Sequence, residues 1–228
     1  MDKSAYYRQN SIVESYESLR YSSAGGAYVN ERELSTALSL LPEGGMVLDL
    51  PCGLGRFSEA AKVQASEIIS ADFSLEMLAA AVNLKRVTNI VRADAFQMPF
   101  PADTFDAVVS LRFTFHYSSI ESLFDEVGRI LKPGGVFIFD TYTWSPFMLP
   151  GTPMVVGGRS YIHSYRTIHR LAPRHGFKVK ATKGCFLFSP LVYRFLPRGA
   201  ISKFEKIESR VPQRMRNVLF WSLEKSTA

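Results

Sequence analysis

Strands that end in acidic residues and alternate with helices constrain this sequence more than any other feature. The apolar run Met46–Leu50 leads into a loop with two glycines, "PCGLG", and then into a short helix to about residue 63. "EIISAD" and "NIVRAD" read as two further strands, with the helix "SLEMLAAAVNL", capped by Ser74, between them. Strands that are apolar on both faces and alternate with helices indicate a parallel sheet covered on two sides.

The same alternation continues to about residue 140 and then loosens. "FDAVVSL" and "GVFIFD" are predicted as the fourth and fifth strands, with the helix "ESLFDEVGRIL" between them. A helix over 161–174 precedes a sixth strand, "GFKVKATKG", and "VLFWSLEK" is the seventh. Two helices precede the first strand, one from Asp2 to about Leu19 and one after the break at Gly25 and Gly26, where Asn30 and Glu33 could form a capping pair.

Length and composition allow one sizeable domain. The chain has 228 residues, of which 46% are hydrophobic and 21% charged, ordinary values for a globular protein. No apolar run reaches the roughly 18 residues of a membrane span, the first ten residues are too polar for a signal peptide, and two cysteines make neither a disulfide framework nor a metal site. We therefore expect a cytoplasmic protein without a metal.

The charge is distributed unevenly. Residues 1–150 contain 12 lysines and arginines against 18 acids, whereas residues 151–228 contain 15 against 3. A segment this basic can attract nucleic acid, anionic lipid or an acidic substrate. A solvated basic face without a partner is the alternative.

The acids that end the strands indicate where a ligand binds and what it carries. In an open parallel sheet, ligands bind outside the carboxyl ends of the strands, where Asp49, Asp72 and Asp94 stand. The loop lacks the third glycine of a dinucleotide fingerprint, since Ser58 occupies that place, and no P-loop pattern occurs. Asp49 would also repel a diphosphate. A ligand with an ammonium group suits this loop better, although the alternative remains that the acids only cap helices.

Four motifs in order resemble those of a known family. "VLDLPCGLGRF", "SADFSLEML", "RADAFQMPFPADTFDAVVSL" and "EVGRILKPGGVFIFD" are similar to the successive motifs of class I S-adenosylmethionine-dependent methyltransferases, in particular the type 11 group with its quinone-biosynthesis C-methyltransferases. The resemblance covers about residues 10–140. It implies an α/β fold, a three-layer αβα Rossmann-like sandwich whose seven-stranded sheet is mostly parallel with the last strand antiparallel.

The resemblance also implies a cofactor, S-adenosylmethionine, with S-adenosylhomocysteine as product, and a task for individual residues. Asp49 would reach the cofactor's ammonium group, Asp72 its ribose hydroxyls, and Asp94 its adenine amino group. The expected cofactor-binding residues are Tyr16, Arg20, Asp49, Gly53, Gly55, Asp72, Phe73, Met77, Asp94, Ala95, Ser110 and Leu111. Pro51 departs from the family's pattern, which has glycine there, so residue 51 must adopt a negative φ.

One domain is expected over residues 1–228, with an amino-terminal helical lid (about 1–41) and a carboxy-terminal cap insertion (about 184–215). Candidates for contact with the methyl acceptor are Arg112, His116, Tyr142, Phe188 and Tyr193, and no catalytic residue is assigned. His116 is the best placed general base, if the acceptor must lose a proton. The apolar stretch from Cys185 to Leu196 could line an acceptor pocket, touch a lipid surface, or only fill the core.

The predicted function is methyl transfer to a small or lipid-like molecule, apolar or anionic. The motif of adenine-amino methyltransferases is missing after the fourth strand, as is the cysteine of cytosine-C5 enzymes. We therefore expect no nucleic-acid partner and no membrane span, and leave peripheral membrane contact open. A non-catalytic cofactor-binding protein and an RNA methyltransferase that uses the basic carboxy-terminal third are the alternatives.

Overall fold

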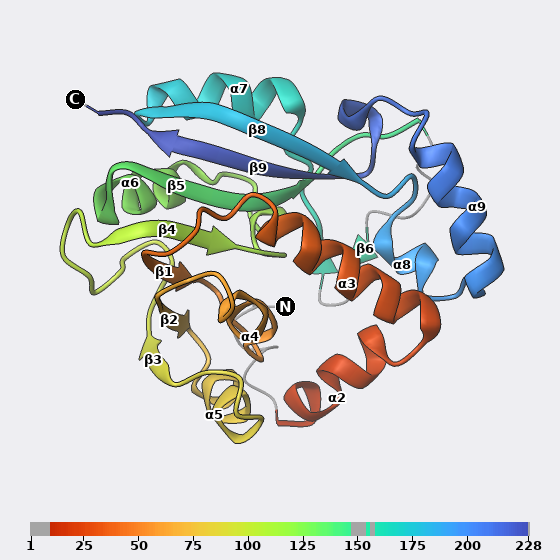
Figure 1. The fold of residues 1–228 in the computed structure, drawn as a ribbon, viewed down its shortest axis with the longest axis horizontal. Helices are drawn as coiled ribbons and strands as arrows, with labels where there is room; N and C mark the ends of the chain where they lie inside the picture. Colours follow the sequence, from red (N-terminus) through yellow and green to blue (C-terminus); the bar gives the residue numbers. More distant parts are fainter. Residues whose placement is uncertain (1–9, 147–153, 156–157, 228) are drawn as a thin grey trace.

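The computed structural model describes residues 10–146, 154–155 and 158–227. Figure 1 shows a central sheet with helices on both faces. The sheet strands are β1 (Met46–Asp49), β2 (Glu67–Asp72), β3 (Asn89–Arg92), β4 (Phe105–Ser110), β5 (Leu131–Tyr142), β8 (Phe177–Cys185) and β9 (Val218–Lys225), in the order β3-β2-β1-β4-β5-β9-β8. Strands β1 to β5 pair in parallel, and β9 runs antiparallel to both β5 and β8. The predicted seven-stranded α/β fold is confirmed.

The helices are α2 (Asn10–Tyr21), α3 (Ala24–Leu38), α4 (Arg56–Ala61), α5 (Leu75–Asn83), α6 (Glu121–Ile130), α7 (Tyr165–Arg174), α8 (Pro190–Tyr193) and α9 (Arg198–Glu208), with two 3-10 turns, η1 (Thr114–His116) and η2 (Gln213–Met215). A separate hairpin joins β6 (Met154–Val155) to β7 (Gly158–Arg159). None of the described helices is both long and apolar enough to cross a membrane.

Alternate residues of the central strands face two separate cores. Val108 belongs to the core that α6 and α7 cover, whereas its neighbours Ala107 and Val109 belong to the core under α3 and α4. The side chains of a strand point to opposite faces in turn, so a strand buried on both faces must be apolar throughout. This is the reason that the near-continuous apolar runs identified the sheet.

The amino-terminal helices differ from the prediction. Ser23 caps α3 by accepting a hydrogen bond from the Gly26 backbone N–H at 3.0 Å, so both glycines lie inside the helix and the predicted Asn30–Glu33 capping pair is wrong. A Cβ on Gly25 would stand 1.7 Å from the carbonyl oxygen of Tyr193. The glycine allows α3 to pack directly on α8, a close contact between distant segments that the sequence does not reveal.

The starts of α7 and β5 also differ from the predicted boundaries. α7 begins at Tyr165, four residues after the predicted start, because Ser164 caps it by accepting from the Thr167 backbone N–H. β5 begins at Leu131, so it also includes the residues "KPG" that lie between the predicted helix "ESLFDEVGRIL" and the predicted strand "GVFIFD". The predicted helix from Asp2 is described only from Asn10, and its first part lies outside the described residues.

Candidate functional site

A cavity of about 420 Å³ lies at the carboxyl ends of β1, β2 and β4. Its described lining brings together many of the predicted residues: Asp49, Gly53, Asp72, Phe73, Met77, Asp94, Ala95, Leu111, Arg112 and His116. These residues come from four segments separated in sequence, and the parallel strands place them at one edge of the sheet. A cavity of this size at the switch between the two halves of an open sheet is the expected ligand site of such a fold.

The loop after β1 presents its backbone to the cavity. Gly53 has φ +54°, and apart from its two chain neighbours no described residue has an atom within 4 Å of the place where a Cβ would stand. Gly55 has φ +73°, but there a Cβ would stand 2.6 Å from Cγ1 of Val87. Both backbone conformations favour glycine. The first glycine leaves room for a ligand, and the second lets α4 begin close against the chain that follows α5.

Pro51 lines the same cavity and fits the loop as expected. Among the described residues it is absent from those with positive φ, and its peptide bond with Leu50 is cis. A proline has no backbone N–H to donate. The loop's donors to a ligand must therefore come from the residues after it.

Asp72, at the end of β2, holds this loop in place. Its Oδ2 accepts a hydrogen bond from the Gly53 backbone N–H at 2.8 Å, and its Oδ1 accepts one from the Ser74 backbone N–H at 2.9 Å. Burial raises the pKa of the carboxyl, while the backbone donors oppose that shift. Each carboxylate oxygen can accept a second hydrogen bond, so the side chain can both order the loop and accept hydroxyl groups from a ligand.

Asp49, at the end of β1, lies deeper. It is 2% exposed, and its Oδ2 accepts from both the backbone N–H and the hydroxyl of Ser58, at 3.1 and 2.7 Å. Burial raises the pKa of Asp49 to about 7, against these hydrogen bonds and the nearby Arg56. The carboxyl is thus poised to gain or lose a proton near neutral pH, and a cationic group placed beside it would favour the ionised form.

Four more of the predicted cofactor residues line the cavity: Phe73, Met77, Asp94 and Ala95. Met77 is buried, and Phe73 is 37% exposed with the Arg92 guanidinium 5.5 Å from its ring centroid. Asp94 is exposed and accepts from the Phe96 backbone N–H at 2.9 Å, next to the buried Ala95. Flat apolar side chains beside an exposed carboxylate suit a ring that carries an amino group.

Sequence reasoning missed a buried ion-pair group at the cavity. Glu33 on α3 is 3% exposed and pairs with Arg112 at 2.7 Å and with Arg56 at 3.6 Å. The Arg56 guanidinium also stacks on the Tyr21 ring, 4.3 Å from its centroid. Arg56 and Arg112 both line the cavity. The sequence assigned Glu33 only to a capping pair with Asn30, and no local signal marked its pairing with two distant arginines.

Arg112 is held from a second side. It has φ +57°, and its backbone N–H donates to Oδ1 of Asp140 at 2.5 Å. Burial raises the pKa of Asp140 to about 7, with a further contribution from the negative charge of Glu33. Arg112 thus follows β4 in a left-handed conformation, its backbone is held by Asp140 of β5, and its side chain lines the cavity.

Other predicted residues lie elsewhere. Ser110 is fully buried and, like Gly55, does not line the cavity in the part of the chain that is described. Tyr142 stacks on Phe115, 4.5 Å between centroids, behind the lining. Tyr193 is fully buried and is not among the described lining residues. Its hydroxyl oxygen accepts a hydrogen bond from the Leu187 backbone N–H, and the Phe188 ring packs against it. Phe188 and Tyr193 pack in a core cluster with Phe204 of α9 and are not among the described lining residues, so their contact with an acceptor stays a prediction.

Arg20 lies on α2 and is not among the described lining residues, and the side chain of Tyr16 lies outside the described residues. Besides Phe57, three neighbouring aromatic residues that sequence reasoning did not select line the cavity: Phe96, Phe113 and Tyr117. Their ring centroids stand 4.8 to 5.9 Å apart. These three rings give the cavity an apolar wall, and Arg112, whose guanidinium pairs with Glu33, also lines the cavity.

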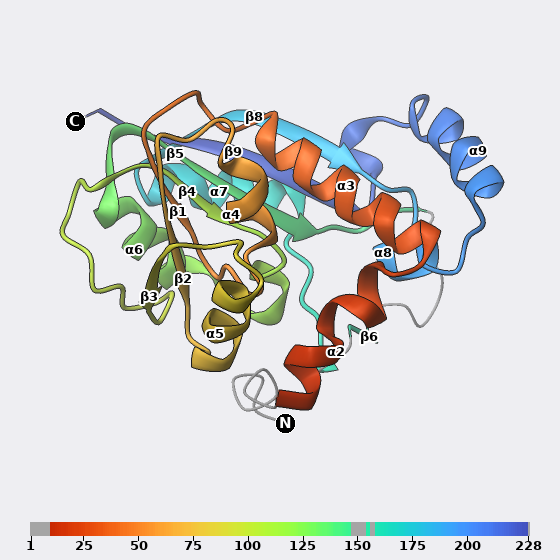
Figure 2. The same cartoon turned by 60° about the horizontal axis from the view of Figure 1, so that its bottom comes forward.

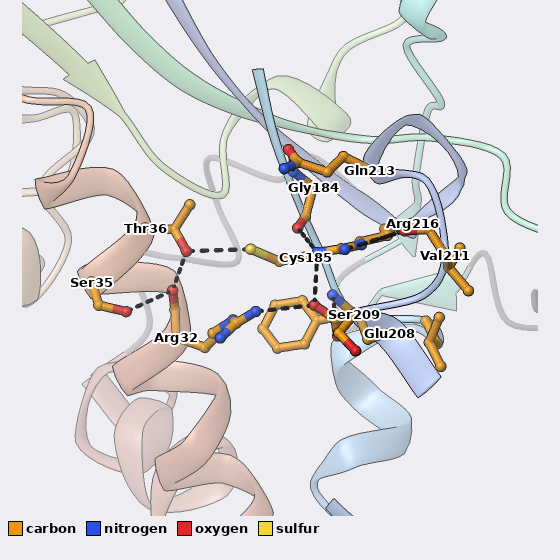
Figure 3. Close-up of polar contacts among 12 residues, drawn as sticks. Arg32, Ser35, Thr36, Gly184, Cys185, Glu208, Ser209, Val211, Gln213 and Arg216 are labelled. Atoms are coloured by element: carbon orange, nitrogen blue, oxygen red, sulfur yellow. Dashed lines mark hydrogen bonds and ion pairs between the residues drawn. The ribbon is translucent and has the colours of Figure 1, made fainter. Parts of the chain in front are cut away.

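A second buried polar group joins the segment between β8 and β9 to α3 (Figure 3). Oε1 of Glu208, on α9, forms ion pairs with Arg32 at 3.1 Å and with Arg216 at 3.2 Å. Oε2 of Glu208 accepts a hydrogen bond from the Phe186 backbone N–H at 3.1 Å. The thiol of Cys185 lies 3.3 Å from the Thr36 hydroxyl in the same group. These contacts fasten the segment to the body of the protein.

The sheet order, the glycine loop and the strand-end acids define the class I methyltransferase fold. Residues 48–139 match the family model of the methyltransferase domain, which confirms the resemblance predicted from the motifs. The chain is 34% identical over 111 residues to the sterol 24-C-methyltransferase of Aspergillus fumigatus. That match covers 46% of this chain and 29% of the relative's length.

Solved structures extend the likeness over nearly the whole chain. An S-adenosylmethionine-dependent methyltransferase from Thermotoga maritima is similar with a TM-score of 0.69 and 21% identity, over 95% of this chain and 97% of that one. Phosphoethanolamine N-methyltransferase 2 of Haemonchus contortus, in complex with S-adenosyl-L-methionine, is similar with a TM-score of 0.68 and 20% identity, over 96% of this chain and 58% of that one. At these identities the likeness shows the fold.

Proposed function

We propose that this protein is an S-adenosylmethionine-dependent methyltransferase that acts on a small, lipid-like molecule. One observation carries the proposal: Asp49, Asp72 and Asp94 meet the open backbone of Gly53 around a single cavity. Bound there, S-adenosylmethionine would supply an electrophilic methyl group on its sulfonium. The residues present fit that group, since the space beside Gly53 is open and Asp72 keeps acceptor capacity after its two backbone hydrogen bonds.

The chain's own contribution is placement. Asp72 would hold the cofactor's ribose, and Asp49, in its ionised form, would favour the ammonium group. Phe73, Met77, Asp94 and Ala95 would bind the adenine, and Leu111 would lie beside the reacting methyl group. Alignment of two reactants in a water-poor cavity can supply about 7–11 kcal/mol of a displacement barrier. No proton transfer is needed unless the acceptor must lose one, and then His116, which lines the cavity, is the candidate base.

The acceptor class follows from the other half of the cavity. Phe96, Phe113 and Tyr117 present apolar ring surface, and Arg112 is the cation among them. A matched relative is a sterol 24-C-methyltransferase, aligned over 29% of its length, so it supports a lipid-like acceptor without naming it. An apolar molecule with an anionic or strongly polar end fits this wall best. A cytoplasmic location is part of the same proposal.

The proposal is tested by supplying S-adenosylmethionine with a labelled methyl group and a lipid extract, a water-soluble metabolite extract and bulk RNA. We expect label in the lipid fraction, and much less when Phe113 is replaced by Asp. The matched control is Val63→Asp, an apolar residue that is 89% exposed and lies outside both the described cavity lining and the carboxy-terminal segment. Label in RNA alone would favour an RNA methyltransferase, and cofactor binding without transfer to any fraction would favour a non-catalytic binding protein.

A further inference from the structure

α9 turns a basic face away from the body of the protein. Ile201 and Glu208 are 5% and 1% exposed and mark the side of the helix that packs inward. At 100° per residue, Lys203 and Lys206 lie on the opposite side, and Arg210 follows one turn later. All three side chains are exposed. In both views α9 lies at the rim of the molecule (Figures 1 and 2).

The charges on this face are not neutralised by the protein. Among the described residues, Lys203, Lys206, Arg210 and Arg214 form no ion pair, and the nearby buried acid, Glu208, is already shared by Arg32 and Arg216 behind them. Four unpaired cations in the span 203–214 therefore face solvent. Such a field attracts an anionic surface more strongly than scattered, paired charges do.

Exposed apolar side chains stand among these cations. Phe195, just before α9, is 79% exposed, Ile207 is 45% exposed, and Met215, beside Arg214, is 36% exposed. We call these residues together the cap surface: Phe195, Lys203, Lys206, Ile207, Arg210, Arg214 and Met215. Single exposed apolar residues are ordinary, but apolar side chains interleaved with lysine and arginine are the composition of segments that lie in a lipid interface.

The cap surface belongs to the functional edge of the sheet. β8 runs parallel to β5, because each is antiparallel to β9, so the carboxyl end of β8 lies at the same edge as the cavity. The cap follows that end. Trp144, 64% exposed, follows the end of β5 at the same edge, and tryptophan is enriched at membrane interfaces.

We propose that the cap surface docks this protein onto an anionic lipid bilayer. Charge complementarity selects the occupant, since unpaired cations meet anionic headgroups while Phe195, Ile207 and Met215 enter the acyl boundary. RNA would use the cations but would leave the aliphatic side chains without a role. The inference goes beyond the transfer reaction and requires neither the cofactor nor the acceptor to bind.

Sedimentation with sucrose-loaded vesicles tests the proposal on the full chain. The vesicles are phosphatidylcholine alone, or phosphatidylcholine with about one third phosphatidylglycerol, at low and physiological salt. We expect binding to the anionic vesicles only, weakened by salt. Lys203→Glu/Lys206→Glu should lower the partition coefficient at least about tenfold, and Phe195→Ser by about threefold to tenfold.

The matched control is Arg174→Glu/Lys178→Glu, which changes the net charge equally at the exposed amino end of β8, the opposite edge of the sheet. It should stay within about twofold of the unmodified protein. Unchanged unfolding temperatures show that the variants are folded. The proposal is overturned if the unmodified protein ignores anionic vesicles at low salt, if both charge variants lose binding equally, or if only single-stranded RNA is bound. Cofactor binding, titrated separately, reports on the transfer proposal and not on this one.

Discussion

The Gly53 backbone N–H donates to Oδ2 of Asp72 over 2.8 Å, so the loop after the first strand is fixed by the acid that ends the second. The other oxygen of that acid accepts a hydrogen bond from the backbone N–H of Ser74, the residue that caps α5. One carboxylate therefore orders two of the segments around the cavity. Asp72 has a structural role as well as the proposed ligand role, and a good test must separate them.

Asp72→Asn is such a test. The amide has one acceptor oxygen, so its NH2 group must face one of the two backbone donors, and a ribose hydroxyl loses a charged acceptor. We expect affinity for S-adenosylhomocysteine to fall about tenfold to a hundredfold, a loss of about 1–3 kcal/mol. The unfolding temperature of the ligand-free protein should fall by a few degrees. A lower unfolding temperature with normal affinity would leave Asp72 with the structural role alone.

The two loop glycines should respond differently to the same change. Gly53→Ala places a methyl group in open space and should weaken S-adenosylhomocysteine binding strongly, at a stability cost of about 1 kcal/mol for the positive φ. Gly55→Ala places it 2.6 Å from Val87 and should destabilise the fold more than Gly53→Ala does. Chemical denaturation and calorimetric titration of both variants check this. If Gly53→Ala bound normally, the loop would not face the ligand.

The pKa of Asp49, raised to about 7 by burial, gives a pH dependence with a definite sign. The pKa of an Asp in the unfolded chain is about 4. Between that pH and about pH 7, the folded protein therefore holds more protons at Asp49 than the unfolded chain does. The free energy of unfolding of the ligand-free protein should therefore fall as pH rises through this window. Asp140, whose pKa burial also raises to about 7, adds to the same slope.

Cofactor affinity should move in the opposite direction. The ionised carboxylate of Asp49 is the form that attracts an ammonium group, so the affinity for S-adenosylhomocysteine should rise between about pH 6 and about pH 8. Asp49→Asn keeps an acceptor for Ser58 but cannot ionise, so both slopes should become shallower. A pH dependence of affinity that is unchanged in Asp49→Asn would remove Asp49 from the ammonium site.

Glu208 is expected to secure the segment between β8 and β9. Its side chain is 2% exposed and meets two arginines, so Glu208→Gln leaves Arg216 and the half-exposed Arg32 without their anion. Breaking a buried pair in this way costs about 3–5 kcal/mol. The matched control is Glu43→Gln, an exposed acid outside any ion pair among the described residues, which should be within about 0.5 kcal/mol of the unmodified protein. Equal stability of the two variants would contradict this reading.

The cofactor half of the site was predictable because it depends on local signals. A strand-end acid and the loop beside it are near in sequence, and the parallel sheet brings Asp49, Asp72 and Asp94 to one edge without further information. Glu33 and Arg56 were missed because their pairing joins a helix before the first strand to the helix after it. The sequence also left two readings of Phe188 and Tyr193 open, because an apolar stretch does not reveal whether it lines a cavity or fills a core.

Calorimetric titration of the full chain with S-adenosylhomocysteine tests the central claim most directly. We predict one binding site on the unmodified protein, weakened about tenfold or more by Asp72→Asn and by Gly53→Ala, and unchanged by Phe195→Ser, which alters only the cap surface. No heat of binding at millimolar S-adenosylhomocysteine or S-adenosylmethionine, from a protein that unfolds cooperatively, would contradict the account.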